Sequence, residues 1–410
     1  MGQELGTDRG WSGLLARLPA GLDLAAAARA HRAFVRPRGV RSAAALLRLA
    51  LVYANTPLSL RGTAAWAAAA GVAEISDVAL LHRLRQAEAW LGSILAALLG
   101  EAMGAPAEVG RPVQVVDATG LGWPGPRKGV AWRVHARLDL PAARFSGFVL
   151  TTGAGGERLD RFAPAPGAIV LADRCYARHG GLASVWARGA DLIVRYGLSG
   201  SAVRDPAGNR VTLNAVLGRP GLPDLADLPV ELPGPEGTWR AARLVVARRP
   251  EAAALKSRAR IDRKARKRGG TATVKQRRSA DWLALLTTLE AGAYPAERVV
   301  ALYRLRWQIE LAFKRLKGQV RLGDLQAKEP RLARACLLAK LILALLAEGL
   351  ADRARRPFRL GSAPPAPAAL FVAPDAARPA RPAGNVARSG PRDRLARPPW
   401  PPPAAPRRAA

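Results

Sequence analysis

The sequence predicts an α/β protein in which a mixed sheet carries helices on both faces and follows a helical N-terminal region. Three segments from Pro112 onward are typical of strands, because they are short apolar runs or alternate apolar with polar residues. A fourth strand, a helix and a fifth strand come next, and this order favours a mixed sheet covered by helices. The five strand candidates lie in VQVVDATG, GVAWRVHARLDL, FSGFVLTT, APGAIVLA and ADLIVRYG.

Five segments of different character follow one another along the chain. Residues 1–105 carry apolar and basic positions at helical spacing, which predicts either a plain helical bundle or a bundle that binds DNA ends. Residues 106–197 and 281–355 contain the strand candidates and two long helices, and we expect them to form one core. Residues 198–280 are short strand-like pieces separated by Gly and Pro, typical of a β-rich insertion, and they end in a basic segment. Residues 356–410 are rich in Pro, Ala and Arg and are expected to be disordered.

The chain has a large excess of positive charge. Its 410 residues include 64 Lys and Arg against 31 Asp and Glu, a formal net charge of +33. Such an excess indicates a polyanionic partner, and nucleic acid is the partner it favours. Residues 248–278 hold 13 basic and two acidic residues. This segment is either a solvated, partly disordered run or a contact for the nucleic-acid backbone, and its composition favours the contact.

Cysteine and histidine patterns exclude several kinds of site. Cys175 and Cys336 are far apart, and the chain has neither a Cys-x-x-Cys pair nor a His-Glu-x-x-His motif. We therefore expect no disulfide framework, no zinc site, and a reducing cytoplasmic environment close to the nucleoid. The N-terminus lacks the basic-then-apolar order of a signal peptide. The two most apolar stretches are interrupted by Arg48 and Lys340, so they are predicted to be buried helices and not membrane spans.

The most informative segment is the run YRLRWQIELAFKRLKG. On a helical wheel at 100° per residue, Tyr303, Arg306, Glu310 and Lys317 fall within about 60° of one another. A separate apolar stripe that must face a core consists of Leu302, Leu305, Ile309, Ala312, Phe313 and Leu316. The sequence thus predicts one helix whose exposed face holds a carboxylate among two cations and a phenol. Such a face is suited to holding a metal ion next to a phosphodiester.

Two aspartates can complete a metal site with Glu310. Asp117 and Asp173 each end an apolar run, so both carboxylates would emerge at one edge of the sheet if the runs are neighbouring parallel strands. Three converging carboxylates suit two Mg²⁺ ions, which prefer oxygen ligands. Two such ions can activate a nucleophile and stabilise the leaving oxygen of an in-line displacement. Either aspartate could instead be an ordinary turn or capping residue.

These segments resemble those of a known enzyme family. The spacing of Tyr303, Arg306, Glu310 and Lys317 resembles the Y-(2)-R-(3)-E-(6)-K motif of bacterial DDE transposases of the insertion-sequence-four family. The segments DATG and LADRCY resemble the two aspartate motifs of that family, and the similarity extends over about residues 30–350. The resemblance implies a ribonuclease-H-like core interrupted by a β-strand insertion. It also implies Mg²⁺-dependent cleavage of double-stranded DNA at terminal inverted repeats and strand transfer into target DNA by a synaptic homodimer. Mn²⁺ is expected to substitute for Mg²⁺, and no membrane is expected as a partner.

The resemblance also assigns roles to individual residues. By motif position, Asp117, Asp173 and Glu310 become the catalytic, metal-binding triad. The residues that would hold the terminal DNA phosphate are Tyr303, Arg306 and Lys317. Trp282 lies at a place where related transposases with a hairpin intermediate carry a tryptophan that stacks on a flipped base. Such stacking is worth roughly 1–3 kcal/mol per base. The alternative for Trp282 is a strand residue packed in the core.

Three functions remain open from the sequence alone. The first is an active cut-and-paste transposase. The second is an inactive DNA-binding remnant of one, since the tail 356–410 does not resemble a dimerisation helix pair. The third is a metal-dependent nuclease without joining activity. A structural RNA-binding protein is not favoured, because the chain has no aromatic pattern of the RRM, KH or OB type.

Overall fold

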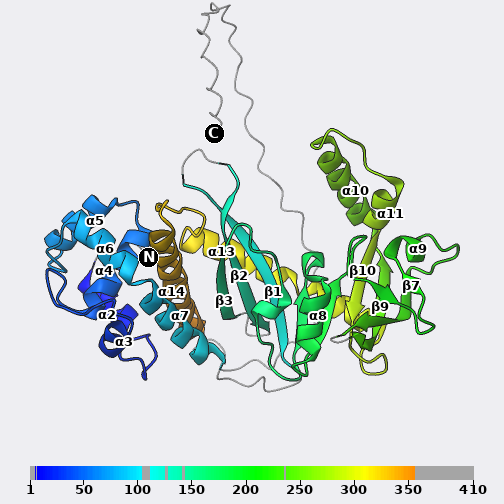
Figure 1. Ribbon diagram of the computed structural model, residues 1–410, viewed down its shortest axis with the longest axis horizontal. Coiled ribbons are helices and arrows are strands. Elements are labelled where there is room, and N and C mark those ends of the chain that lie inside the picture. Colours follow the sequence, from blue (N-terminus) through cyan, green and yellow to red (C-terminus); the bar gives the residue numbers. More distant parts are fainter. Residues whose placement is uncertain are drawn as a thin grey trace, which may run out of the picture. The chain divides into compact units, whose positions relative to one another are not determined.

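A ten-stranded mixed sheet forms the centre of the computed structural model (Figure 1), in the order β3-β2-β1-β4-β5-β10-β9-β8-β6-β7. The structure describes residues 5, 7–103, 111–124, 128–140, 144–234 and 237–355. The tail 356–410 lies outside these residues. The strands are β1 (Val113–Gly122), β2 (Val130–Leu140), β3 (Arg144–Thr152), β4 (Ile169–Ala172), β5 (Asp191–Arg195), β6 (Val203–Arg204), β7 (Arg210–Val211), β8 (Leu225–Pro233), β9 (Trp239–Arg248) and β10 (Trp282–Thr287).

The first five strands have the arrangement of a ribonuclease-H-like core. Strands β1, β2 and β3 form an antiparallel meander. Strand β4 lies parallel to β1, and β5 lies parallel to β4. The helix α8 (His179–Trp186) connects β4 to β5. All five predicted strands are present, and the predicted α/β class with a mixed sheet is confirmed.

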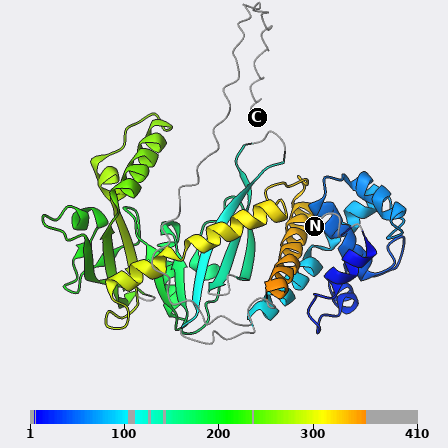
Figure 2. The same ribbon diagram turned by 180° about the vertical axis from the view of Figure 1, so that it is seen from behind.

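Helices cover both faces of this sheet, because successive side chains of a strand point to opposite faces. On β1, Val115 belongs to the apolar cluster that contains Ile309 and Phe313. The next residue, Val116, belongs to the cluster that contains Leu182 of α8. Ile309 and Phe313 lie on α13 (Trp307–Gln319), which follows α12 (Ala296–Arg304). Figure 2 shows these two helices, in yellow, crossing one face of the sheet.

The described residues before β1 form helices, as predicted. They are α2 (Asp8–Leu15), α3 (Leu24–Ala30), α4 (Ala43–Asn55), α5 (Leu60–Ala69), α6 (Asp77–Gln86) and α7 (Glu88–Met103). Their starts are set by N-cap side chains: Asp23, Ser42, Ser59 and Ser76 each accept a hydrogen bond from a first-turn N–H. The last helix, α14 (Pro330–Arg355), packs against α4, α6 and α7. In the described part of the chain, no helix has the length and apolar character needed to cross a membrane.

The insertion between β5 and β10 differs in two ways from the expected small β-rich unit. Strands β8 and β9 continue the main sheet, since β10 pairs along its whole length with residues 243–248 of β9, and β9 pairs with β8. The basic segment is not an open run but forms α10 (Glu251–Arg266) and α11 (Val274–Ala280). A capping box of Thr273 and Gln276 starts α11. Ion pairs of Arg258 with Asp281 and of Arg277 with Asp262 hold the segment together.

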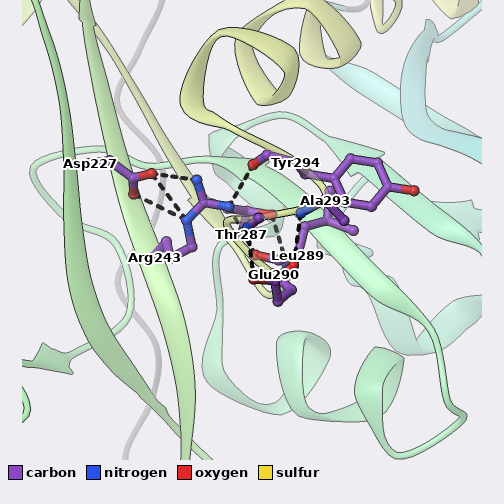
Figure 3. A network of polar contacts seen from close by, with 8 residues as sticks. Asp227, Arg243, Thr287, Leu289, Glu290, Ala293 and Tyr294 are labelled. Carbon is purple, nitrogen blue, oxygen red and sulfur yellow. Dashed lines mark hydrogen bonds and ion pairs between the residues drawn. The ribbon is translucent and has the colours of Figure 1, made fainter.

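A polar network ties the insertion to the loop that leads into α12 (Figure 3). Arg243 on β9 pairs with Asp227 on β8. The same guanidinium donates to the carbonyl oxygens of Leu289 and Tyr294, at 3.0 and 2.8 Å. Within the loop, the Glu290 carboxylate accepts from two backbone N–H groups, at 2.7 and 2.8 Å. The loop after β10 is therefore fixed both to itself and to two insertion strands.

The single long helix expected over the YRLRWQIELAFKRLKG run is divided in two. Helix α12 ends at Arg304 and α13 begins at Trp307. Between them, the N–H of Leu305 bonds to the carbonyl of Leu302, and the N–H of Arg306 to that of Tyr303, both at 3.0 Å. These i to i−3 bonds tighten the chain by a 3₁₀-type turn. The angular positions of Tyr303 and of the residues after it are therefore not those of one ideal helix.

Candidate active site

Asp117 and Asp173 lie side by side where the parallel pairing of β1 with β4 ends. The parallel pairing of β1 with β4 ends at Val116 and Ala172. Asp117 directly follows Val116, and Asp173 directly follows Ala172. Asp173 leaves β4 as the N-cap of a short 3₁₀ helix, η2 (Arg174–Tyr176). The expectation that β1 and β4 are neighbouring parallel strands is confirmed, and Asp173 follows the end of β4. Asp117 does not end its strand, because β1 continues to Gly122 in its antiparallel pairing with β2.

Asp117 is a largely buried carboxyl with a raised pKa. Its side chain is 19% exposed, and its Oδ1 accepts from the N–H of Ala118 at 2.8 Å. Burial raises its pKa from 3.8 to about 6. The N–H of Ala118 and the guanidinium of Arg306 oppose this shift, whereas the carboxylates of Asp173 and Glu157 add to it. Glu157 was not anticipated from the sequence, because it lies outside every motif.

Arg306 connects the sheet to α13. Its Nη1 donates to Asp117 Oδ2 at 3.2 Å, and its Nη2 donates to Glu310, four residues further on. The Arg306 side chain is 17% exposed and that of Glu310 is 59% exposed. Burial opposes the charge of Arg306, but Tyr303, Glu310 and Asp117 raise its pKa above its ordinary value. The acid from the strand and the acid from the helix thus meet at one guanidinium.

Tyr303 and Asp173 complete the neighbourhood. Tyr303 is only 7% exposed, so the expectation that it shares the exposed face of Glu310 and Lys317 is wrong. The turn after α12 directs Tyr303 into the apolar cluster, with its ring centroid 6.0 Å from the guanidinium carbon of Arg306. Burial and the nearby Asp173 raise the pKa of its phenol. Asp173 pairs with Arg195 at 3.7 Å, and its buried Oδ1 has no hydrogen-bond partner within the described chain.

The carboxylates of Asp117, Asp173 and Glu310 have the right chemistry for a divalent cation, although the three do not converge on one position in this structure. No three His, Cys, Asp or Glu side chains among the described residues stand close enough together to hold a metal ion. Asp117 and Asp173 supply adjacent oxygens, and the Oδ1 of Asp173 is without a hydrogen bond. Glu310 is half exposed on a helix surface and can turn its side chain. Carboxylate oxygens are the ligands that Mg²⁺ and Mn²⁺ prefer, so Asp117, Asp173 and Glu310 fit such an ion once Arg306 releases the two acids it bridges.

Two exposed side chains extend the site along α13. Lys317 lies in the last turn and is exposed, as predicted. Trp307 is 49% exposed one turn before Glu310, which is unusual for so large an apolar side chain. Trp307 lies outside the four-residue motif and was not predicted as a site residue. Its position outside the apolar stripe of the helical wheel was the available signal.

A pocket of about 560 Å³ opens next to Asp173. Trp282, the first residue of β10, lines it and also packs against the apolar cluster under α8. Arg195, the ion-pair partner of Asp173, lines it as well. The other basic residues that line the pocket are Arg174, Arg178, Lys264 and Arg268. Trp282 therefore contacts the core cluster and also borders a basic pocket.

Comparison with known proteins identifies the family of this chain. Residues 108–346 match the family described as "Transposase DDE domain". The chain is 37% identical over 347 residues to the putative transposase InsL for insertion sequence element IS186A of Escherichia coli (strain K12), which covers 83% of this chain and 93% of that protein. It is also 37% identical over 348 residues to the transposase for insertion sequence element IS421 of Escherichia coli, with the same coverage. The matched region includes β1, β4 and α13, and the chain belongs to the DDE transposase family.

Proposed function

We propose that this protein is a DNA transposase of the insertion-sequence-four family that cuts DNA at the ends of its element and joins the freed strands to target DNA. The proposal is carried by one observation: Asp117 of the sheet and Glu310 of α13 are held by the same guanidinium, beside Asp173. An ion pair with a purely structural role would not need Asp173 next to Asp117 and Glu310, because like charges at close range destabilise a fold.

The chemistry divides between the acids and the cations around them. Asp117, Asp173 and Glu310 would hold Mg²⁺ or Mn²⁺, which when bound activates water and stabilises the leaving oxygen of a phosphodiester. Arg306 offers a planar pair of donors to a DNA phosphate placed beside the carboxylates. Tyr303, nearly buried against Arg306, contributes by orienting that side chain. Lys317 supplies a further positive charge for the DNA end.

The insertion provides a surface suited to the DNA backbone. Within the described residues, nine exposed cations on α10, α11 and the turn between them take part in no ion pair: Lys256, Arg260, Arg263, Lys264, Arg266, Lys267, Arg268, Lys275 and Arg278. Cations without acidic partners are available to replace the counterions of DNA. We assign this surface and residues 1–105 to binding of the terminal inverted repeats and the target. The protein would bind them as a homodimer in the synaptic complex. This would take place in the cytoplasm, where chromosomal DNA lies.

A single reaction mixture tests the proposal. The full chain is incubated with duplex DNA taken from the sequence that flanks its gene, with Mg²⁺ or Mn²⁺, and the products are separated on a denaturing gel. We expect strand cleavage at the element end followed by joined products. Binding without cleavage would identify an inactive remnant. Cleavage without joined products would identify a nuclease.

Replacing Lys317 with methionine should weaken binding of the DNA end and make it less sensitive to salt. Loss of one phosphate contact lowers the slope of log affinity against log salt concentration by about 0.9. Binding is measured at several salt concentrations without divalent cations. Lys317→Arg keeps the charge and should keep the slope. An unchanged slope in Lys317→Met would remove this residue from the interface.

Replacing Trp282 with alanine should impair hairpin formation or resolution and spare the first nick. Loss of one base-stacking contact weakens an opened DNA end by roughly 1–3 kcal/mol, whereas the first nick acts on paired DNA. Trp282→Phe retains a ring and should retain most of the hairpin product. Quantifying nicked and hairpin species over time separates these steps. An equal loss at every step would leave Trp282 as a core residue only.

A further inference from the structure

A second pocket lies at the far end of α13. It has a volume of about 490 Å³ and is formed by the end of α4, the start of α5, the connection from α13 to α14, and α14 itself. The residues that line it include Tyr53, Ser59, Leu60, Arg321, Asp324 and Lys340. None of them belongs to the candidate active site.

Lys340 makes this pocket chemically unusual. The residue is 2% exposed, and its ammonium donates to the carbonyl of Val320 at 2.9 Å. No carboxylate of the described residues lies within ion-pair distance of it. Burial lowers its pKa from 10.5 to about 8, so it still carries a proton at pH 7. Cys336 and the carboxylate of Asp324, which also lines the pocket, oppose this shift, whereas Arg321 adds to it. A lysine has three donors, and a buried positive charge without a direct ion pair is costly unless an anion joins it.

Other groups in the wall also suit a polar occupant. Arg321 lines the pocket and is 58% exposed, held only by a surface ion pair with Asp324 at 2.7 Å. Such pairs are weak and easily exchanged. Ser59 and Leu60 place the N-terminus of α5 at the wall, adding a partial positive charge.

The pocket lies beyond the C-terminal end of α13, whereas Glu310 lies in the first turn of this helix. On α13, Glu310, Lys314 and Lys317 are exposed and spaced four and three residues apart, so they follow one face of the helix towards Arg321. At 1.5 Å per residue, the end of α13 at Gln319 lies about 14 Å along the helix from Glu310, and Arg321 follows two residues later. One strand of duplex DNA advances 3.4 Å per nucleotide, so this separation corresponds to about four or five nucleotides.

We propose that this pocket binds a backbone phosphate of the DNA strand, four or five nucleotides from the phosphodiester that is cleaved, with Lys340 and Arg321 as its cationic ligands. The register of this assignment rests on the proposed function, because it counts nucleotides from the carboxylate Glu310. The pocket would hold the duplex along α13 while the chemistry takes place at the other end of the helix.

A phosphate-by-phosphate scan tests the assignment. Duplexes with the terminal sequence from the flank of the gene carry a single neutral methylphosphonate at successive positions of the cleaved strand. Binding is measured without divalent cations. In the wild-type protein, neutralising the phosphate in the pocket should weaken binding about tenfold. Arg321→Gln should lose its sensitivity at that position and keep it at all others. Arg29→Gln, an exposed change on α3, should behave as wild type.

Lys340 requires a separate control, because it also donates to the carbonyl of Val320, the C-cap residue of α13. Lys340→Met is expected to lower the melting temperature as well as abolish sensitivity to the neutral phosphate. Tyr53→Phe removes only a hydroxyl that lines the pocket and should weaken binding at the same position by a smaller factor with the melting temperature kept. A scan in which Arg321→Gln and Lys340→Met keep the wild-type pattern would overturn the proposal.

The outcome is independent of cleavage. If the wild-type protein cuts and joins DNA but the variants leave the scan unchanged, the pocket assignment fails and the transposase function stands. If no cleavage occurs but the scan changes in the variants, the pocket assignment stands and the transposase function fails. Stabilisation by inorganic phosphate that requires Lys340, with a scan insensitive to the pocket variants, would show a site for a free anion and overturn the DNA assignment.

Discussion

Replacing Asp117 with asparagine is expected to abolish metal-dependent cleavage and at the same time to stabilise the metal-free protein above pH 6. Cleavage should fall at least about 10³-fold, because the developing charge of the reaction loses several kcal/mol of stabilisation when one metal ligand is removed. The gain in stability follows from burial, which raises the pKa of Asp117 from 3.8 to about 6. The contribution of Asp117 to the free energy of unfolding is favourable below pH 4 and is lost as the pH rises through 6.

Melting curves without divalent cations measure the effect on stability. At pH 8 we expect Asp117→Asn to be more stable than the wild type by about 1–3 kcal/mol. At pH 4 the difference should nearly vanish, because the wild-type carboxyl is then protonated. Asp262→Asn, which removes a surface acid paired with Arg277, should show no such pH dependence. A variant less stable than the wild type at pH 8 would contradict the view that ionised Asp117 is destabilising.

Replacing Arg306 with glutamine is expected to destabilise the protein and to reduce cleavage together. The change leaves Asp117 and Glu310 without the guanidinium that bridges them. Loss of hydrogen bonds to charged groups costs about 1.5–3 kcal/mol. Arg306→Lys retains the charge but cannot reach both carboxylates with a planar pair of donors, so it should be intermediate in both properties.

A double-variant comparison isolates the contact itself. With Asp117→Asn already present, Arg306→Gln removes a cation that no longer faces a charged partner at the sheet. Its effect on stability should therefore be smaller than in the wild type, with a coupling of about 0.5–3 kcal/mol. Stability is measured by chemical unfolding at pH 8. Additive effects would show that the hydrogen bond of Arg306 to Asp117 contributes nothing in solution.

The core of the fold was predictable because its signals are local. The alternation in β2 and the apolar runs of β4 and β5 can be recognised within a few residues. Asp117 and Asp173 were found for the same reason, since each follows such a run. The sequence also separated the apolar stripe of α13 from its charged face, and Ile309 and Phe313 are buried as expected.

The errors arose where distant contacts decide the structure. A helical wheel assumes one continuous helix, and no Gly or Pro marks the turn at Leu305 and Arg306. That turn buries Tyr303 and directs Arg306 to Asp117. Helix α10 has only a weak apolar stripe and many like charges, so its folding depends on ion pairs that no local pattern reveals. The pairing of β9 with β10 is likewise a long-range choice.

The guanidinium of Arg243 connects the inserted segment to the catalytic core and limits the movement of one against the other. It joins β8 and β9 to the loop after β10, and that loop begins the path to Glu310. A load that bound DNA applies to α10 and α11 would therefore pass through stiff, hydrogen-bonded strands into α12 and α13. Binding of DNA to the insertion would thus be mechanically coupled to the position of Glu310.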